Sequence, residues 1–247
     1  DVYKRQTLGQ GANIQKDDII TIAKNKIIDK AGNTAANDIV FTIPEAQDTI
    51  PPAPPTVALQ EDTGISDSDG ITNNGTLVVS GIEAGATWKY KIGDGNWTDG
   101  TGTSFVLPEG EYLAESIQVK QIDAANNKSN TWTNSTKIVV DTTPPNDISI
   151  VSASLEFDTG DIGDFITYTK QNSFTATLNR ALDTGETLWA SLDSGENFVN
   201  VTAMFDKNTN KLSWTEINLK AGTNSFQLKV LDEAGNSSSV VSQDYTL

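Results

Sequence analysis

Apolar and polar residues alternate over several short stretches of the chain, as they do in strands that bury one face. Clusters of glycine, asparagine and aspartate separate these stretches, and no stretch repeats its apolar positions with the period of a helix. The alternating apolar positions are Trp88, Tyr90 and Ile92; Ile117 and Val119; Leu188, Ala190 and Leu192; and Phe226, Leu228 and Val230. The pattern predicts an all-β protein.

Three short motifs recur along the chain in the same order, which identifies a tandem repeat. They are an Asp-rich turn that reads Asp-x-Ala-Gly-Asn in two of its copies, an Asp-Thr-x-Pro-Pro segment, and an Asp-Thr-Gly segment. The turn lies at 29–33, 123–127 and 232–236, the proline segment at 48–52 and 141–145, and Asp-Thr-Gly at 62–64 and 158–160. Short turns repeated by chance would not keep this order.

The proline pairs mark the repeat boundaries, because proline fixes φ and removes a backbone donor. We expect the C-terminal fragment of a unit at 1–50 (the first fragment), a whole unit at 51–143 (the middle unit) and a longer, divergent one at 144–247 (the C-terminal unit). Residues 1–6 match nothing in the repeat, and we expect them to be extraneous. About seven short strands in fewer than about 100 residues predict an immunoglobulin-like β-sandwich, and the repeats predict a linear array.

The composition excludes several classes of function. The chain of 247 residues has a net charge of −16 and contains neither histidine nor cysteine. The absence of these residues removes the commonest general base, any thiol nucleophile and the usual zinc ligands, so we do not expect an enzyme. The negative charge argues against a nucleic acid or an anionic membrane as partner, and no apolar run is long enough for membrane insertion.

Four segments of the middle unit carry a resemblance to a known family. They are the strand 56–59 after the prolines, the acidic segment 62–75, the run Gly85-Ala86-Thr87-Trp88, and the hairpin 93–97. With the proline linkers, they resemble the bacterial Ig-like tandem repeats of giant secreted or surface adhesins, which are RTX-type proteins with biofilm-associated extender domains. The turn at 123–127 departs from that pattern, because Asn126 replaces the glycine; asparagine still tolerates positive φ.

The resemblance implies a structural extender, extracellular and on a bacterial cell surface, that supports cell adhesion and biofilm formation. Its partners would be neighbouring Ig-like repeats of the same chain and, through other domains, host or surface ligands. It also implies structural calcium at the junctions between domains.

The order of strands in a sandwich brings acidic loops together at the junctions. Calcium takes six to eight oxygen ligands in flexible geometry, so such loops are candidate calcium sites. We expect Asp62, Asp67, Asp69, Asp141 and Asp232 at the junction between the middle and C-terminal units, Asp48 and Asp123 at the one before, and Asp158, Asp161 and Asp164 facing a further unit. The alternative is that each aspartate only caps its own turn.

A binding module is the alternative function. The five tryptophans could form a carbohydrate- or ligand-binding surface centred on 144–247, the unit that diverges most. Trp88 is in phase with the core positions, whereas Trp189 is out of phase and is expected to face outward. Aromatic side chains clustered around Trp189 would favour binding, whereas side chains that complete a junction would favour the extender.

Overall fold

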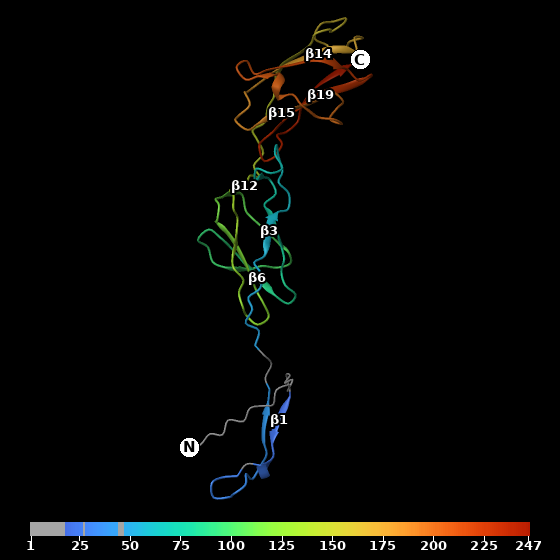
Figure 1. Cartoon of the computed structure of the whole chain (residues 1–247). Coiled ribbons are helices and arrows are strands. Elements are labelled where there is room, and N and C mark those ends of the chain that lie inside the picture. The colour runs from blue at the N-terminus through green and yellow to red at the C-terminus, as the bar shows by residue number, and fades with distance from the viewer. Residues whose placement is uncertain (1–17, 27, 44–46) are drawn as a thin grey trace.

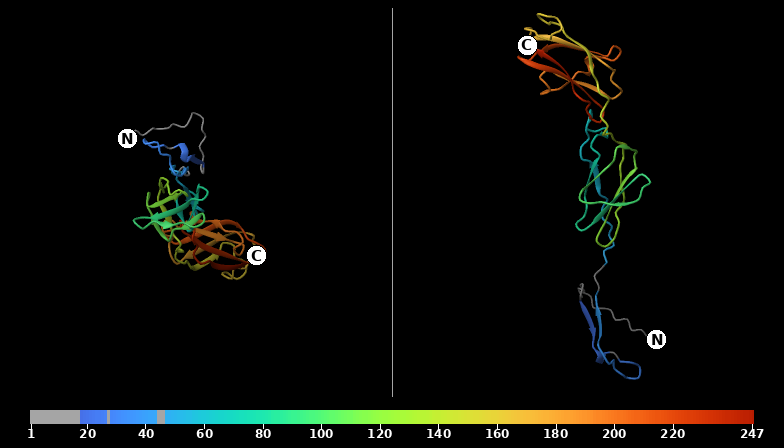
Figure 2. Two further views of the ribbon diagram at one scale, coloured as in Figure 1. Left: turned by 90° about the horizontal axis from the view of Figure 1, so that it is seen from below. Right: turned by 180° about the vertical axis from the view of Figure 1, so that it is seen from behind.

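The computed structural model describes residues 18–26, 28–43 and 47–247, and it is built almost entirely of strands. The prediction that residues 1–6 are extraneous therefore falls outside the described residues. The chain is elongated: the C-terminal unit, the middle unit and an N-terminal hairpin follow one another along one direction (Figures 1 and 2). The predicted all-β, Ig-like sandwich fold is confirmed. Within the described ranges, no helix has the length and apolar character needed to cross a membrane.

Small sheets enclose the core of the middle unit. One sheet has the order β3-β5-β8, a second β11-β10-β6-β7, and a third β4-β12-β9. The strands are β3 (Thr56–Leu59), β4 (Ile71–Thr72), β5 (Thr76–Ser80), β6 (Thr87–Ile92), β7 (Thr98–Asp99), β8 (Ser104–Val106), β9 (Gly110–Tyr112), β10 (Ile117–Ile122), β11 (Trp132–Thr133) and β12 (Ile138–Val140). Alternation in β10 buries Ile117 and Val119, and Trp88 is only 4% exposed, so the predicted core role of Trp88 is confirmed.

The C-terminal unit is a sandwich of two four-stranded sheets with the orders β13-β14-β18-β17 and β16-β15-β19-β20. Its strands are β13 (Ile150–Leu155), β14 (Gln171–Leu178), β15 (Thr187–Ser191), β16 (Val199–Asn200), β17 (Phe205–Asp206), β18 (Lys211–Asn218), β19 (Thr223–Leu231) and β20 (Val241–Thr246), with the 3-10 helix η2 at Thr202–Met204. Stacked rings of Phe174 and Phe226, with centroids 3.9 Å apart, join the two sheets across the core.

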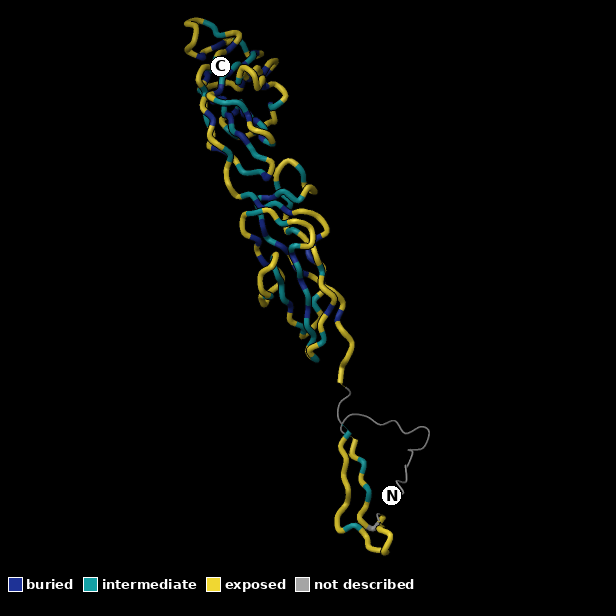
Figure 3. The backbone as a smooth tube through the Cα atoms, turned by 90° about the vertical axis from the view of Figure 1, so that its left-hand side faces the viewer, coloured by how far each residue is buried: buried dark blue, intermediate teal, exposed yellow. Residues whose placement is uncertain are grey.

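The N-terminal hairpin pairs β1 (Ile19–Ile22) with β2 (Ile39–Thr42) in antiparallel register and includes the 3-10 helix η1 (Lys24–Lys26). Its apolar side chains are largely exposed, and Phe41 has an exposed fraction of 55%. Figure 3 shows this hairpin mostly in the colour of exposed residues, in contrast to the two sandwiches. The hairpin therefore has no hydrophobic core of its own among the described residues.

The last strand of the middle unit leaves next to its acidic loop. Strand β12 pairs in parallel with β4, with Val139 opposite Ile71 and Val140 opposite Thr72. The chain therefore passes into the linker 141–143 beside the segment 62–74, which we call the docking loop. This arrangement brings the loop and the linker together at the junction.

Candidate functional site: the junction between the two sandwiches

The linker between the sandwiches is held from both sides. On the side of the middle unit, Glu109 accepts hydrogen bonds from the hydroxyls of Thr142, at 2.5 Å, and Thr143, at 3.1 Å. These bonds, that from Thr142 first, hold the pKa of the Glu109 carboxyl below its ordinary value. On the side of the C-terminal unit, the Asn236 side-chain amide donates to the carbonyl oxygen of Asp141 at 2.8 Å.

Asn236 belongs to the turn 232–236, which we call the junction turn. Both carboxylate oxygens of Asp232 are used inside it: Oδ1 accepts from the Asn236 backbone amide at 2.8 Å and Oδ2 from its side chain at 2.9 Å. Gly235 completes the turn at a φ of +90°. The Asn236 amide is thus oriented by its own turn before it reaches the linker.

The docking loop of the middle unit bonds directly to the backbone of the junction turn. The Thr63 hydroxyl oxygen lies 2.7 Å from the carbonyl oxygen of Ala234. The Ile65 amide donates to the carbonyl oxygen of Glu233 at 3.3 Å. Neither contact involves a carboxylate, so the acidic residues are not the groups that join the two backbones.

Two glycines allow this close approach. A Cβ on Gly64 would lie 2.1 Å from the carbonyl oxygen of Glu233, and one on Gly235 would lie 2.9 Å from the Cα of Gly64. Both distances are shorter than any ordinary contact between nonbonded atoms. The docked arrangement therefore requires glycine at both positions.

Trp189 lies at this junction. With Ile65 of the docking loop and Leu231 it lines a pocket of about 390 Å³, and its indole nitrogen donates to the Thr187 hydroxyl at 3.1 Å. Trp189 is half-buried, and Trp214, the other tryptophan of this unit, is in the core. Trp189 is the one aromatic residue among those that line this pocket, so the cluster of aromatic side chains expected of a sugar-binding surface is not found around it there.

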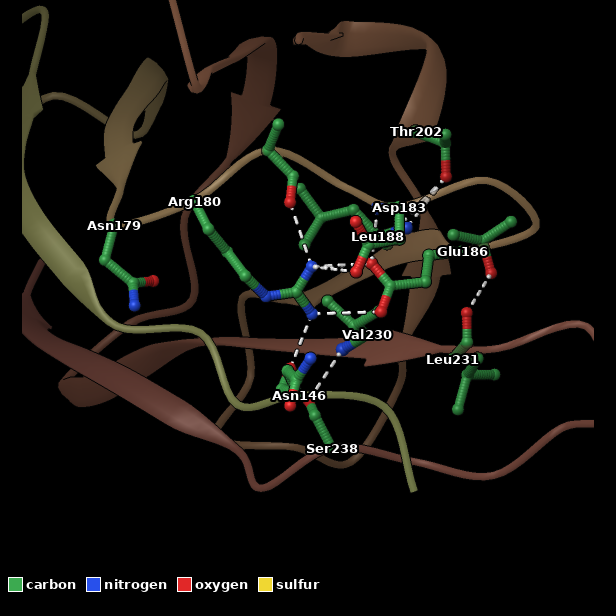
Figure 4. Close-up of polar contacts among 12 residues, drawn as sticks. Asn146, Asn179, Arg180, Asp183, Glu186, Leu188, Thr202, Val230, Leu231 and Ser238 are labelled. Atoms are coloured by element: carbon green, nitrogen blue, oxygen red, sulfur yellow. Dashed lines mark hydrogen bonds and ion pairs between the residues drawn. The ribbon is translucent and has the colours of Figure 1, made fainter. Parts of the chain in front are cut away.

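A bidentate ion pair fixes the start of the C-terminal unit. The Arg180 guanidinium bonds both oxygens of Glu186, at 2.7 and 3.0 Å, and donates to the carbonyl oxygen of Asn146 just after the linker (Figure 4). Glu186 also accepts from the Asp183 amide at 2.7 Å. The bond to Glu186 is the main cause of the raised pKa of Arg180. This pair holds the first residues after the prolines against the loop 183–186.

The structure brings some of the predicted aspartates to the junctions, and most of them cap turns. Asp62, Asp67 and Asp69 lie in the docking loop, Asp141 in the linker and Asp232 in the junction turn; Asp48 and Asp123 occupy equivalent places before the middle unit, and Asp158, Asp161 and Asp164 lie in the equivalent loop of the C-terminal unit. Carboxylate oxygens of eight of them accept amide hydrogens from their own loops: Asp48, Asp62, Asp69, Asp123, Asp141, Asp158, Asp164 and Asp232.

No three acidic side chains of the described part of the chain come together in a group that could hold a metal ion. One oxygen is exceptional at each of two equivalent positions. Oδ1 of Asp62 and Oδ1 of Asp158 are buried, and neither accepts a hydrogen bond from any residue that the structure describes. Calcium at the junctions stays a prediction, and Asp62 and Asp158 are the positions that support it.

The junction before the middle unit is built differently. Asn127 donates to the carbonyl oxygen of Asp48 at 3.0 Å, as Asn236 does to Asp141. However, Asn126 occupies the place of Gly235, with a φ of +70°. The turn 123–127 therefore keeps the positive φ of the junction turn, but it carries a side chain where Gly235 has none.

Sequence patterns did not identify the groups that make the junction. In the sequence, Thr63, Gly64 and Gly235 are parts of repeated motifs whose aspartates are the residues that predict a site. A usable signal existed, because both glycines belong to motifs placed at opposite poles of adjoining units.

No protein-family model matches this sequence, and no curated protein matches it. Among solved structures, the FN1–FN3 domains of chicken CNTN1 are similar to the chain at 13% identity and a TM-score of 0.43, over 90% of this chain and 76% of that one. A tetra-tandem repeat from the extending region of a large adhesion protein is similar at 16% identity and a TM-score of 0.22, over 89% of this chain and 54% of that one.

The Bacteroides ovatus mixed-linkage glucan utilisation protein SGBP-B, solved with a heptasaccharide, is similar at 14% identity and a TM-score of 0.23, over 87% of this chain and 49% of that one. The chain thus spans about half the length of the adhesion-protein repeat and of SGBP-B. These likenesses concern the β-sandwich fold alone and carry no argument about function.

Proposed function

We propose that the chain is a structural extender segment of a large bacterial surface adhesin, in which tandem Ig-like units keep a fixed orientation and project other domains outward. It would act outside the cell and support cell adhesion and biofilm formation. The observation that carries the proposal is the direct bonding of docking loop, linker and junction turn. Such a joint serves no purpose in a chain whose domains bind independently, whereas a spacer needs it.

The contacts are strong enough to favour one orientation. A hydrogen bond contributes about 0.5–1.5 kcal/mol net. The bonds Thr63–Ala234, Ile65–Glu233 and Asn236–Asp141 would together contribute about 1.5–4.5 kcal/mol. If the three bonds contribute about 3 kcal/mol, fewer than about 1% of the molecules would be undocked, because about 1.4 kcal/mol changes the equilibrium constant tenfold.

Calcium is a separate part of the proposal. A carboxylate oxygen that is buried without a donor, such as Oδ1 of Asp62, is a site where a cation would offset the cost of burying charge. Too few carboxylates lie together to provide all six to eight oxygen ligands of a calcium ion, so backbone carbonyls and water would have to supply the others. At about 100-fold excess over its dissociation constant, bound calcium would add roughly 2.7 kcal/mol to the free energy of unfolding.

The orientation is tested by distance measurements within the whole chain. The chain has no cysteine, so cysteines introduced at the exposed turn positions Asn96 and Lys207 would carry the only two spin labels. Double electron–electron resonance should give one narrow distance distribution between the two units. A broad distribution that no added ion narrows would contradict the extender and favour independently moving binding modules.

Calcium is tested by thermal unfolding of the same chain with calcium, with magnesium and with chelator. A calcium-specific rise in melting temperature that Asp62→Asn abolishes is expected. Equal melting temperatures in all three conditions would mean that the acidic turns are only turns, and would leave the orientation result untouched.

A further inference from the structure

We propose that the loop 158–169 of the C-terminal unit, the distal loop, is a docking site for the Asp-x-Ala-Gly-Asn turn of another Ig-like unit. We further propose that the glycine of that turn decides which units can dock. The inference rests on the proposed extender function and adds a rule for which units can be neighbours. The distal loop lies at the pole of this unit that faces away from the middle unit (Figure 2).

The distal loop reproduces most of the hydrogen bonds of the docking loop. Each of four hydrogen bonds in the docking loop has a counterpart at the matching residues, and all eight measure 2.7–3.0 Å. The pairs are Ile71 N to Asp69 and Ile166 N to Asp164; Thr72 Oγ1 to Glu61 O and Thr167 Oγ1 to Phe157 O; Asn73 N and Tyr168 N to the hydroxyls of Thr63 and Thr159; and Asn74 N and Thr169 N to those of Thr72 and Thr167. Asp62 and Asp158 also each accept an amide hydrogen across the loop, but from donors that do not correspond: Gly70 follows Asp69, whereas Gly163 precedes Asp164.

The last strand of each unit runs beside its loop in the same register. The Val139 amide donates to the carbonyl oxygen of Gly70 at 2.8 Å, and the Thr246 amide donates to that of Phe165 at 3.0 Å. Thr246 is therefore the counterpart of Val139, and a residue placed after Leu247 would be the counterpart of Asp141. The end of the last strand of the C-terminal unit thus lies on the path that leads to the junction in the middle unit.

The docking groups of the distal loop are open. Thr159 is the counterpart of Thr63, and the one acceptor for its hydroxyl proton among the described residues is the Ile166 carbonyl oxygen, at a long 3.5 Å. Gly160 is the counterpart of Gly64 and has a φ of +93°, and no atom of the described residues would lie within 4 Å of a Cβ added there. Two large apolar side chains of the same loop, Ile162 and Tyr168, are 94% and 86% exposed.

Three features differ from the docked junction. The distal loop is one residue shorter between its two capping aspartates, and Tyr168 stands where Asn73 lies beside Gly235. Ala221 takes the place of Glu109, since Gly222 meets Leu247 as Gly110 meets Val140. A linker leaving this unit would therefore lack the hold that Glu109 provides.

The contact between the two glycines supplies the specificity. A side chain at Gly235 would have its Cβ 2.9 Å from the Cα of Gly64. The middle unit carries Asn126 at this position of its own turn. A turn of the Asn126 kind should therefore be excluded from a Gly64 or Gly160 loop, although it folds normally.

The test extends the whole chain by a second copy of residues 141–247 placed directly after Leu247, which keeps the linker in register. Cysteines replace Lys207 in both copies of the C-terminal unit and carry spin labels, and the protein is studied at low concentration. A single narrow distance distribution between the copies is expected. A broad distribution would overturn the proposal.

Three variants of this extended chain separate docking from strain. Gly160→Ala in the first copy and Gly235→Asn in the second should each broaden the distribution. Gly163→Ala in the first copy is the matched control, because Gly163 has a φ of +95° and nothing within 4 Å of an added Cβ. If Gly163→Ala broadened the distance distribution equally, or if the first two variants did not broaden it, the proposal that glycine decides which units dock would be overturned. Labels at Asn96 and Lys207 of the original chain report on the extender proposal separately.

Discussion

Replacing Gly64 by alanine should separate the two units at the junction. The new Cβ would lie 2.1 Å from the Glu233 carbonyl oxygen, so the backbones must move apart by more than an ångström. The bonds Thr63–Ala234 and Ile65–Glu233 would then break, at a cost of about 1–3 kcal/mol. Alanine at a φ of +101° adds strain of roughly 1–3 kcal/mol.

Gly160→Ala is the matched control for that strain. Gly160 has nearly the same φ, +93°, in an equivalent loop, and an added Cβ there meets nothing. The backbone strain is therefore common to both variants. The difference between their losses of unfolding free energy is then the contribution of the junction bonds, about 1–3 kcal/mol. For a unit of about 100 residues each kcal/mol corresponds to roughly 4–8 °C in melting temperature.

The assay combines calorimetry with distances between spin labels at Asn96 and Lys207. Gly64→Ala should broaden the distance distribution and lower the melting temperature of the middle unit by more than Gly160→Ala lowers that of the C-terminal unit. The reasoning is refuted if Gly64→Ala leaves the distribution narrow, or if Gly160→Ala broadens it as much.

Three further predictions follow from single side chains. Asn236→Ala removes the bond to Asp141 and should cost about 1 kcal/mol; calorimetry measures the cost, and the label distances should broaden. Hydrogen bonds from Asn197 and then Ser191 lower the pKa of Asp193 to about 2. The carboxylate therefore stabilises the fold fully above about pH 4, and this contribution is lost as the pH falls towards 2. In Asp193→Asn, the free energy of unfolding measured in urea should change less with pH over that window. Arg180→Ala leaves the buried Glu186 carboxylate without its partner and should lower the free energy of unfolding by about 3–5 kcal/mol. A smaller loss in the double variant with Glu186→Gln would identify the unpaired charge as the cause.

The periodicity of the sequence was enough for the fold. Trp88 and Phe226 belong to alternating runs, and both are buried where those runs predict. The repeat motifs also placed the turns at the poles, because motif order in a sandwich repeat follows strand order. These inferences depend on local pattern, which the sequence carries directly.

The chemistry of the junction was not predictable in the same way. The acidic turns predict Asp232 as a calcium ligand, and in the structure both oxygens of that side chain accept hydrogen bonds within its own turn. The choice between capping and chelation depends on side-chain rotamers and on distances between loops of different units. The contact of Gly64 with Gly235 likewise exists only in three dimensions, since neither residue has a side chain that could signal it.

The parallel pairing of β12 with β4 has a mechanical consequence. The chain enters the middle unit near β3 at one pole and leaves through β12 at the other, so tension on the two ends pulls β12 along its own length. Its hydrogen bonds to β4 and β9 are then loaded in shear and must yield together, not one after another as in a zipper. In the C-terminal unit, Ile166 pairs in parallel with Thr246 in the same way. Pulling experiments on single molecules should therefore find each sandwich more resistant along the long axis of the chain than its modest core would suggest.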